Sequence, residues 1–437
     1  MSSRAEATEP AAAPEPGGLL LRRPIVAWAL YDWANSAFAT TVMAGFFPVF
    51  FRQYWSLAAD PTVTTFRLGF ANGIASLVLA VFAPLLGAIA DRGGARMRFL
   101  IVFSALGIVM TGGLYFVEQG AWWFAMGLFL AASIGFAGGN IFYDSLIMDV
   151  APRHRLDLVS AYGFGLGYLG GGILFAINVW MTLAPATFGL PDAAAAVRVS
   201  FLMVAIWWCV FAVPLVLFVR ERRVERRPGV LQAVRGGMAE LITTFHEIRH
   251  FRPLALFLVA YWLYIDGVHT IQKMAVDYGL ALGFPTESLI VALLVTQFVG
   301  FPAALAFGWL GERFGTLTGI FLGLAVYAGV TLWAGFVSEV REFYVIAVAI
   351  GLVQGGIQSL SRSYFGRLIP ADRPGEFFGF YNMMGKFAAV LGPFLAGGVA
   401  LATGSSRMAI VSLVVLFAGG AVMLAFARQA ERTQTAQ

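Results

Sequence analysis

The stretch GAIADRGGAR, residues 87–96, decides the fold, because GWLGERFGTL at residues 308–317 repeats its plan. A constant separation of 221 residues relates Gly87, Asp91, Arg92 and Gly94 to Gly308, Glu312, Arg313 and Gly315. Further along, DVAPRHR at 149–155 matches RLIPADR at 367–373 at nearly the same separation. Two such matches predict a duplicated unit, and duplicated halves are typical of secondary transporters.

The composition indicates a membrane protein. Of 437 residues, 59% are hydrophobic and only 12% are charged. Soluble domains are about 45–50% apolar and about 25% charged. Because the chain has a single cysteine, Cys209, an intrachain disulfide is excluded.

Apolar runs are spaced along the whole chain. A membrane helix needs about 20 apolar residues, and runs of this kind occur at 25–51, 66–90, 98–117, 121–149, 158–183, 199–219, 253–279, 287–310, 316–337, 341–366, 376–402 and 407–427. We expect an all-α membrane protein with 12 transmembrane helices in two pseudo-symmetric six-helix halves. The expected parts are a disordered N-terminal tail (1–24), a first half (25–219), a central loop (220–252), a second half (253–427) and a tail (428–437).

The arginines predict the orientation. They concentrate in alternate loops, which places both termini and the central loop in the cytoplasm by the positive-inside rule. The net charge of +5 therefore reflects topology and not a nucleic-acid partner. Arginine outnumbers lysine 27 to 2, which suggests a GC-rich bacterial genome and hence a bacterial inner membrane.

Several motifs resemble those of the major facilitator superfamily. Residues 87–96 fit its loop signature G-x-L-A-D-R-x-G-R-[KR] at Gly87, Asp91, Arg92, Gly94 and Arg96, with Ile89 in place of Leu. Within that superfamily, YDWANSAF (31–38), YWLYIDGVHTI (261–271) and the stretch 351–393 resemble the vacuole-effluxer branch. Its fungal members are associated with amino-acid efflux from the vacuole. The resemblance implies the major facilitator fold, with helices 1, 4, 7 and 10 lining a central cavity.

The repeated loop motif predicts a cytoplasmic latch. Carboxylates and guanidiniums at helix ends can form charge-assisted bonds between the two halves. The expected latch residues are Gly87, Asp91, Arg92, Gly94, Gly308, Glu312, Arg313 and Gly315. Solvated loop charges are the alternative interpretation.

Polar residues inside the apolar runs form the expected transport site, because ionisable groups at membrane depth usually face a bundle interior or a wet cavity. These residues are Asp32, Asn35, Asn140, Asp144, Asp266, His269, Gln358, Arg362, Asn382 and Lys386. Asp32 and Asp266 begin the same D-x-x-[N/H]-[S/T] pattern and are expected to face a substrate path as a pair. Asp144 aligns with Arg362 between the halves, so a purely structural ion pair is the alternative. Lys273 lies near the outer end of its helix and can extend its ammonium group to the interface.

The mixture of acids and bases favours a small zwitterion, such as an amino acid, as the solute. Arg362 would hold its carboxylate, and an aspartate would hold its ammonium group. Burial disfavours a charged carboxylate, so Asp32 or Asp266 is expected to carry protons. The expected protein is a monomeric secondary transporter that works by alternating access, with efflux as one candidate direction. An exporter of apolar compounds and a sensor that keeps the fold but moves nothing stay open as alternatives.

Other chemistries lack a motif. The G-x-G-x-x-G pattern at 163–170 lies inside an apolar run, where Gly163, Gly167 and Gly171 favour close helix packing. The stretch GFYNMMGK at 379–386 does not fit a phosphate-binding loop. Histidine and cysteine residues show no metal-ligand spacing. We therefore expect no enzyme activity, no cofactor and no metal.

Overall fold

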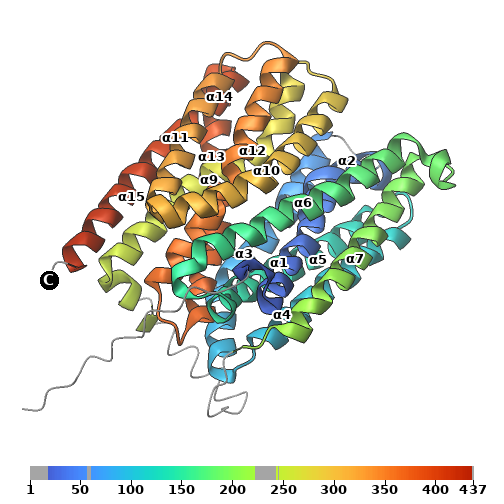
Figure 1. Cartoon of the computed structure of the whole chain (residues 1–437). Helices are drawn as coiled ribbons and strands as arrows, with labels where there is room; N and C mark the ends of the chain where they lie inside the picture. Colours follow the sequence, from blue (N-terminus) through green and yellow to red (C-terminus); the bar gives the residue numbers. More distant parts are fainter. Residues whose placement is uncertain (1–17, 57–60, 222–242, 245, 436–437) are drawn as a thin grey trace, which may run out of the picture.

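The computed structural model describes residues 18–56, 61–221, 243–244 and 246–435, and these residues form a bundle of long helices (Figure 1). The first helix runs through α1 (Arg23–Ala37), η2 (Phe38–Phe46), α2 (Phe47–Phe50) and η3 (Phe51–Trp55). It is followed by α3 (Pro61–Gly93), α4 (Arg96–Gly113), α5 (Trp122–Val150), α6 (Leu156–Leu183) and α7 (Ala193–Phe218). Then come α9 (Arg252–Ala281), α10 (Thr286–Phe314), α11 (Thr316–Ala334), α12 (Val340–Leu368), α13 (Pro374–Thr403), α14 (Ser406–Ser412) and α15 (Val414–Thr435).

The predicted all-α membrane architecture is confirmed. Every predicted apolar run falls in a helix, and eleven helical stretches of the described residues are long and apolar enough to cross a membrane. The run 66–90 lies in α3, which is not among the eleven. The number twelve therefore stays a prediction, as does the side on which the termini lie.

Local sequence sets the helix ends. Pro24, Pro253 and Pro374 stand in the first turns of α1, α9 and α13, where a missing N–H costs no helical hydrogen bond. At Gly315, between α10 and α11, φ is 93°, a conformation that favours glycine. Nine residues of the first helix, Phe38–Phe46, are π-helical, a form that is often found near functional sites.

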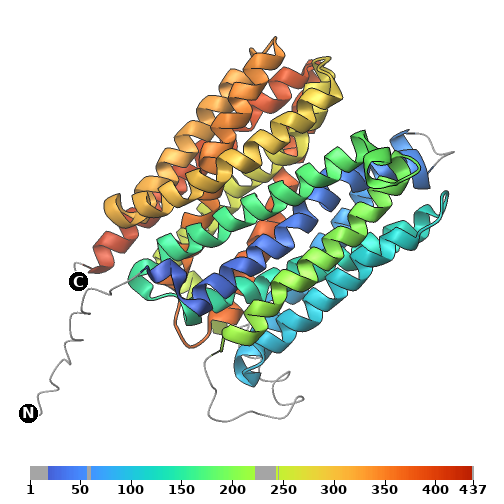
Figure 2. The same ribbon diagram turned by 45° about the vertical axis from the view of Figure 1, so that its right-hand side comes forward.

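The helices pack in two groups that follow the sequence repeat. Helices α1 to α7 contact one another, and α9 to α15 contact one another. Figure 2 shows the start of α1 and the end of α15 at the same end of the bundle. Large apolar side chains such as Phe394 and Leu401 are exposed on the outside, as expected for a surface that faces lipid.

Two seams join the groups, α3 against α13 and α6 against α10 and α12. Glycines allow the close approach. A β-carbon at Gly87 would overlap the carbonyl oxygen of Gly375, and one at Gly308 would lie 2.6 Å from the β-carbon of Ala161. The repeated loop glycines therefore stand at equivalent places in the two seams.

Two of the predicted parts fall largely outside the described residues. These are the N-terminal tail (1–24) and the central loop (220–252). The C-terminal tail differs from the expectation, because α15 continues to Thr435. The Tyr364 hydroxyl donates to Glu431 Oε2 at 2.7 Å, which ties this last segment to α12.

The α3–α13 seam gives a direct test. Gly87→Ala should lower the melting temperature, because overpacking costs about 1–3 kcal/mol where the backbone must move. Gly397→Ala is the matched control, since nothing lies within 4 Å of a β-carbon there. Differential scanning fluorimetry on purified protein measures both, and equal melting temperatures would contradict the seam.

Candidate functional site

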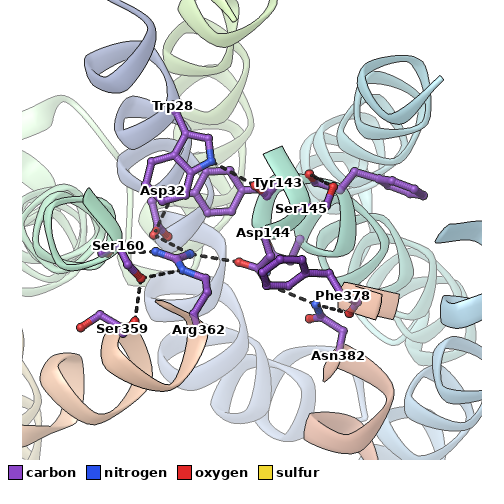
Figure 3. A network of polar contacts seen from close by, with 12 residues as sticks. Trp28, Asp32, Tyr143, Asp144, Ser145, Ser160, Ser359, Arg362, Phe378 and Asn382 are labelled. Atoms are coloured by element: carbon purple, nitrogen blue, oxygen red, sulfur yellow. Dashed lines mark hydrogen bonds and ion pairs between the residues drawn. The ribbon is translucent and has the colours of Figure 1, made fainter. Parts of the chain in front are cut away.

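An ion pair between the two helix groups forms the centre of the site. Arg362 Nη1 on α12 donates to Asp144 Oδ1 on α5 at 3.0 Å (Figure 3). The Arg362 side chain is 2% exposed and that of Asp144 is 13% exposed. The alignment of these residues in the repeat thus corresponds to a real contact.

Each of the three guanidinium nitrogens of Arg362 donates a hydrogen bond. Its Nε donates to Ser160 Oγ and its Nη2 to the Ser160 carbonyl oxygen, each at 2.9 Å. The guanidinium carbon also lies 4.4 Å from the ring centroid of Phe164 and 4.9 Å from that of Trp28. Three of the five guanidinium N–H groups are therefore engaged, and only 2% of the side chain is exposed, so little of Arg362 is accessible to a carboxylate ligand in this state.

Asp32 is the second carboxylate of the cluster. Its Oδ2 lies 4.0 Å from Arg362 Nη1 and accepts a hydrogen bond from the Tyr143 hydroxyl at 3.2 Å. Ser36 Oγ is 3.4 Å from its Oδ1, and 13% of the side chain is exposed. One guanidinium therefore faces two carboxylates, of which Asp144 is the nearer.

Amides extend the cluster in two directions. Asn382 Nδ2 on α13 donates to Asp144 Oδ2 at 3.1 Å, so α13 joins the same network (Figure 3). On the first group, Asn35 Nδ2 donates to Asn140 Oδ1 at 2.6 Å and links α1 to α5. The structure thus brings together Asp32, Asp144, Arg362 and Asn382. The Asn35–Asn140 pair lies on α1 and α5, the helices that also carry Asp32 and Asp144.

Asp266 lies apart from this cluster. Its Oδ2 accepts from the backbone N–H of Gly392 on α13 at 2.9 Å, and Thr270 Oγ1 donates to its Oδ1 at 3.3 Å. The residue is fully buried. Asp266 therefore binds a neighbouring helix, whereas the sequence pattern placed it on a substrate path with Asp32.

The remaining predicted site residues are half-buried. His269 lies on α9, Gln358 on α12 and Lys386 on α13. Among the residues that the structure describes, Lys386 has no carboxylate within ion-pair distance.

The predicted latch residues lie on the two seams. Asp91 Oδ2 accepts from the backbone N–H of Glu376 at 2.8 Å, at the start of α13, where helical N–H groups have no partner within the helix. Glu312 Oε2 pairs with Arg155 Nη1 at 2.7 Å. Both motif carboxylates therefore bridge the helix groups.

The other latch residues have local roles. The exposed Arg313 guanidinium lies over the ring of Trp309, 5.3 Å from its centroid. Arg92 is exposed at the end of α3. Gly94 and Gly315 have positive φ and form turns. The two bridges described above thus come from the acids of the motif.

Sequence reasoning missed Asp157, which is fully buried in the first turn of α6. It accepts from Arg367 Nη2 and Thr316 Oγ1, both at 2.8 Å, and from the Ser363 hydroxyl. All three donors belong to the second helix group. The signal was present, because an acid follows the repeated proline and arginine in each half, at Asp157 and at Glu376.

Contacts between the groups concentrate at one end of the bundle. The bridges of Asp91, Asp157 and Glu312 lie next to the loops at 93–96, 151–156 and 314–316. Toward the opposite end, the described residues show one cross-group hydrogen bond, from Gln297 Nε2 to Thr40 Oγ1 at 2.7 Å. The bundle is therefore closed on the side that the arginines predict to be cytoplasmic.

Comparisons with known proteins agree with this architecture. A profile described as "Vacuole effluxer Atg22 like" matches residues 148–437, and one described as "Major Facilitator Superfamily" matches residues 2–176. The chain belongs to the vacuole effluxer Atg22-like family. It is a major facilitator protein and a multi-pass membrane protein.

Relatives cover bacteria and fungi. The chain is 40% identical over 416 residues to the "Uncharacterized MFS-type transporter YxiO" of Bacillus subtilis, covering 94% of this chain and 96% of that protein. It is 28% identical over 321 residues to Autophagy-related protein 22 of Yarrowia lipolytica, covering 66% of this chain and 53% of that protein. The fungal relative is thus matched over about half of its length.

Solved structures show the same fold. The human organic anion transporter MFSD10 matches with a TM-score of 0.69 at 13% identity, over 92% of this chain and 99% of that one. FucP in the outward conformation matches with a TM-score of 0.62 at 12% identity, over 94% and 99%. The proton:xylose symporter XylE matches with a TM-score of 0.64 at 12% identity, over 93% and 94%.

The central ion pair can be tested by a double-mutant cycle. Arg362→Gln should destabilise the protein by about 3–5 kcal/mol, the usual cost of leaving one partner of a buried pair uncompensated. Adding Asp144→Asn should restore part of that stability, whereas Arg313→Gln, on an exposed arginine, should leave the melting temperature unchanged. Purely additive losses in the double variant would show that the two charges are not coupled.

Proposed function

We propose that the chain is a secondary active transporter of a small zwitterion, such as an amino acid, and works by alternating access in a bacterial inner membrane. The observation that supports this most is the charge arrangement at the base of the space between the helix groups. Two partly exposed carboxylates, Asp32 and Asp144, share one buried guanidinium. The basic side chains of Lys386 and His269 lie on the facing group.

Alternating access agrees with the one-sided closure of the bundle. The polar bridges at the closed end involve side chains of both groups and can be exchanged for contacts with water when that end opens. Glycine seams let the groups rock past each other without loss of packing. The solved neighbour FucP, whose fold this chain shares, has been determined in an outward conformation.

Asp32 is the proposed proton carrier. Arg362 neutralises Asp144 at 3.0 Å, whereas Asp32 lies 4.0 Å from the same guanidinium nitrogen. The other neighbours of Asp32 are the Tyr143 hydroxyl, Ser36 and the α6 backbone at Gly167. The Asp266 carboxylate, by contrast, accepts a hydrogen bond from the Gly392 N–H. A carboxylate that binds either a proton or an ammonium group makes the two compete, and competition at one site exchanges solute for protons. Under an inward proton gradient this exchange moves the solute outward.

Transport by purified protein in liposomes tests the proposal. Each of the twenty standard L-amino acids is offered as a radiolabelled solute, with an imposed pH gradient of either sign. We expect flux of at least one amino acid, in the direction opposite to the proton gradient. Liposomes that carry the protein but show no flux of any amino acid under either gradient would exclude this solute class.

The proton carrier is tested by two isosteric variants. Asp32→Asn should abolish acceleration by a pH gradient and weaken solute binding, because the amide can neither release a proton nor pair with the ammonium group. Asp266→Asn should keep its pH response, since Asp266 holds α13 and faces no solute. The reverse outcome, with pH-driven flux intact in Asp32→Asn and lost in Asp266→Asn, would assign the proton to Asp266.

A further inference from the structure

The transport site contains two candidate cations for an anionic ligand group, and their surroundings differ. Arg362 makes three hydrogen bonds to Ser160 and Asp144 and is 2% exposed. Lys386 is half-buried and, within the described ranges, has no carboxylate within ion-pair distance. A cation at membrane depth is costly unless a partner or a wet cavity compensates it. Of these two cations, Lys386 is therefore the one that lacks a carboxylate partner among the described residues.

Lys386 is placed just above the central cluster. Asn382, four residues earlier on α13, binds Asp144 Oδ2. Residues four apart lie on one helix face about 6 Å apart along the axis. Since α13 starts at the closed end, Lys386 lies one turn further toward the opposite end than the Asp144–Arg362 pair. A solute that enters from the opposite end reaches Lys386 before it reaches Arg362.

Polar neighbours complete the surroundings. His269 on α9 and Gln358 on α12 are both half-buried. Both belong to the second helix group, as Lys386 does. The excess carboxylate, Asp32, belongs to the first group. The acids Asp32 and Asp144 thus belong to the first helix group, and the cations Arg362 and Lys386 belong to the second.

We infer that Lys386, and not Arg362, binds the carboxylate of the zwitterionic substrate, while Asp32 binds its ammonium group. This assignment rests on the proposed function and specifies its substrate: a molecule that bears both charges and bridges α1 and α13. Such a bridge attracts the two helix groups to each other, so the bound solute itself favours closure of the second end. A ligand with only one charge binds one group and favours closure less.

The chain offers a clean chemical probe, because Lys386 and Lys273 are its only lysines. Acetic anhydride in trace amounts is reacted with purified protein, and the acetylation of each lysine is measured by peptide mass spectrometry. A bound amino acid should protect Lys386 about tenfold or more at saturation. Lys273, which is exposed, serves as the internal control and should react equally with and without the amino acid.

Analogues identify the group that Lys386 recognises. For each amino acid that binds, such as phenylalanine, the decarboxylated amine (2-phenylethylamine) and the deaminated acid (3-phenylpropanoate) are compared by thermal shift. Lys386→Gln should weaken binding of the amino acid about tenfold or more, because a charged hydrogen bond is lost. It should leave binding of the amine unchanged. Lys386→Arg should restore part of the preference, and Lys273→Gln should behave as wild type.

The outcomes separate the two proposals. If no amino acid binds the wild-type protein, the proposed function fails and this assignment fails with it. If an amino acid binds but Lys386→Gln keeps the wild-type preference over the amine, only the assignment is wrong. Unprotected Lys386 in the presence of a saturating amino acid leads to the same conclusion. Loss of the preference together with selective protection supports both proposals.

Discussion

The ion pair between Asp144 and Arg362 is the contact on which the arrangement of the two helix groups depends. It joins α5 to α12 in the dry interior, and it positions Asp32, Ser160 and Asn382 around one guanidinium. Removing two charges from water is expensive, and their mutual attraction offsets this only with good geometry and further hydrogen bonds. Here Ser160 supplies those bonds. These hydrogen bonds offset part of the cost of burying the pair.

The closed end follows the same principle with different chemistry. At Asp91 a carboxylate accepts a backbone N–H from the first turn of α13, a favourable place for negative charge. At Asp157 a carboxylate accepts three side-chain donors from the second helix group. Both carboxylates also pair with an arginine, Asp91 with Arg96 and Asp157 with Arg367. Glycines on both seams keep the backbones close enough for these short side chains to reach across.

Whether the sequence predicts a contact in this site depends on the kind of group that each side chain binds. The repeat aligned Asp144 with Arg362 and marked Asp91 and Glu312 as bridging acids, because each of these contacts involves positions of the repeated pattern. Their partners were harder to foresee. Ser160 and the Glu376 N–H are ordinary in sequence, and a backbone donor leaves no trace in it. Helical spacing predicts which residues share a face, but it does not predict which helix that face meets. For this reason the sequence suggested that Arg362 binds the carboxylate of a solute, whereas in the structure it binds Asp144.

The two aspartates of the repeated first helix show how duplicated positions acquire different roles. Each packs against a glycine of another helix, Asp32 against Gly167 on α6 and Asp266 against Gly392 on α13. The residue after the glycine differs. Pro393 follows Gly392 and disturbs the regular hydrogen bonding of α13 at that turn, and the Gly392 N–H donates to Asp266. Tyr168 follows Gly167, so α6 stays regular and offers Asp32 no such donor. Asp32 is left to interact with Tyr143 and Arg362, at the surface between the helix groups. Pro393 in the second half thus accompanies the acid that binds the neighbouring helix, whereas the acid of the first half lies at the surface between the helix groups.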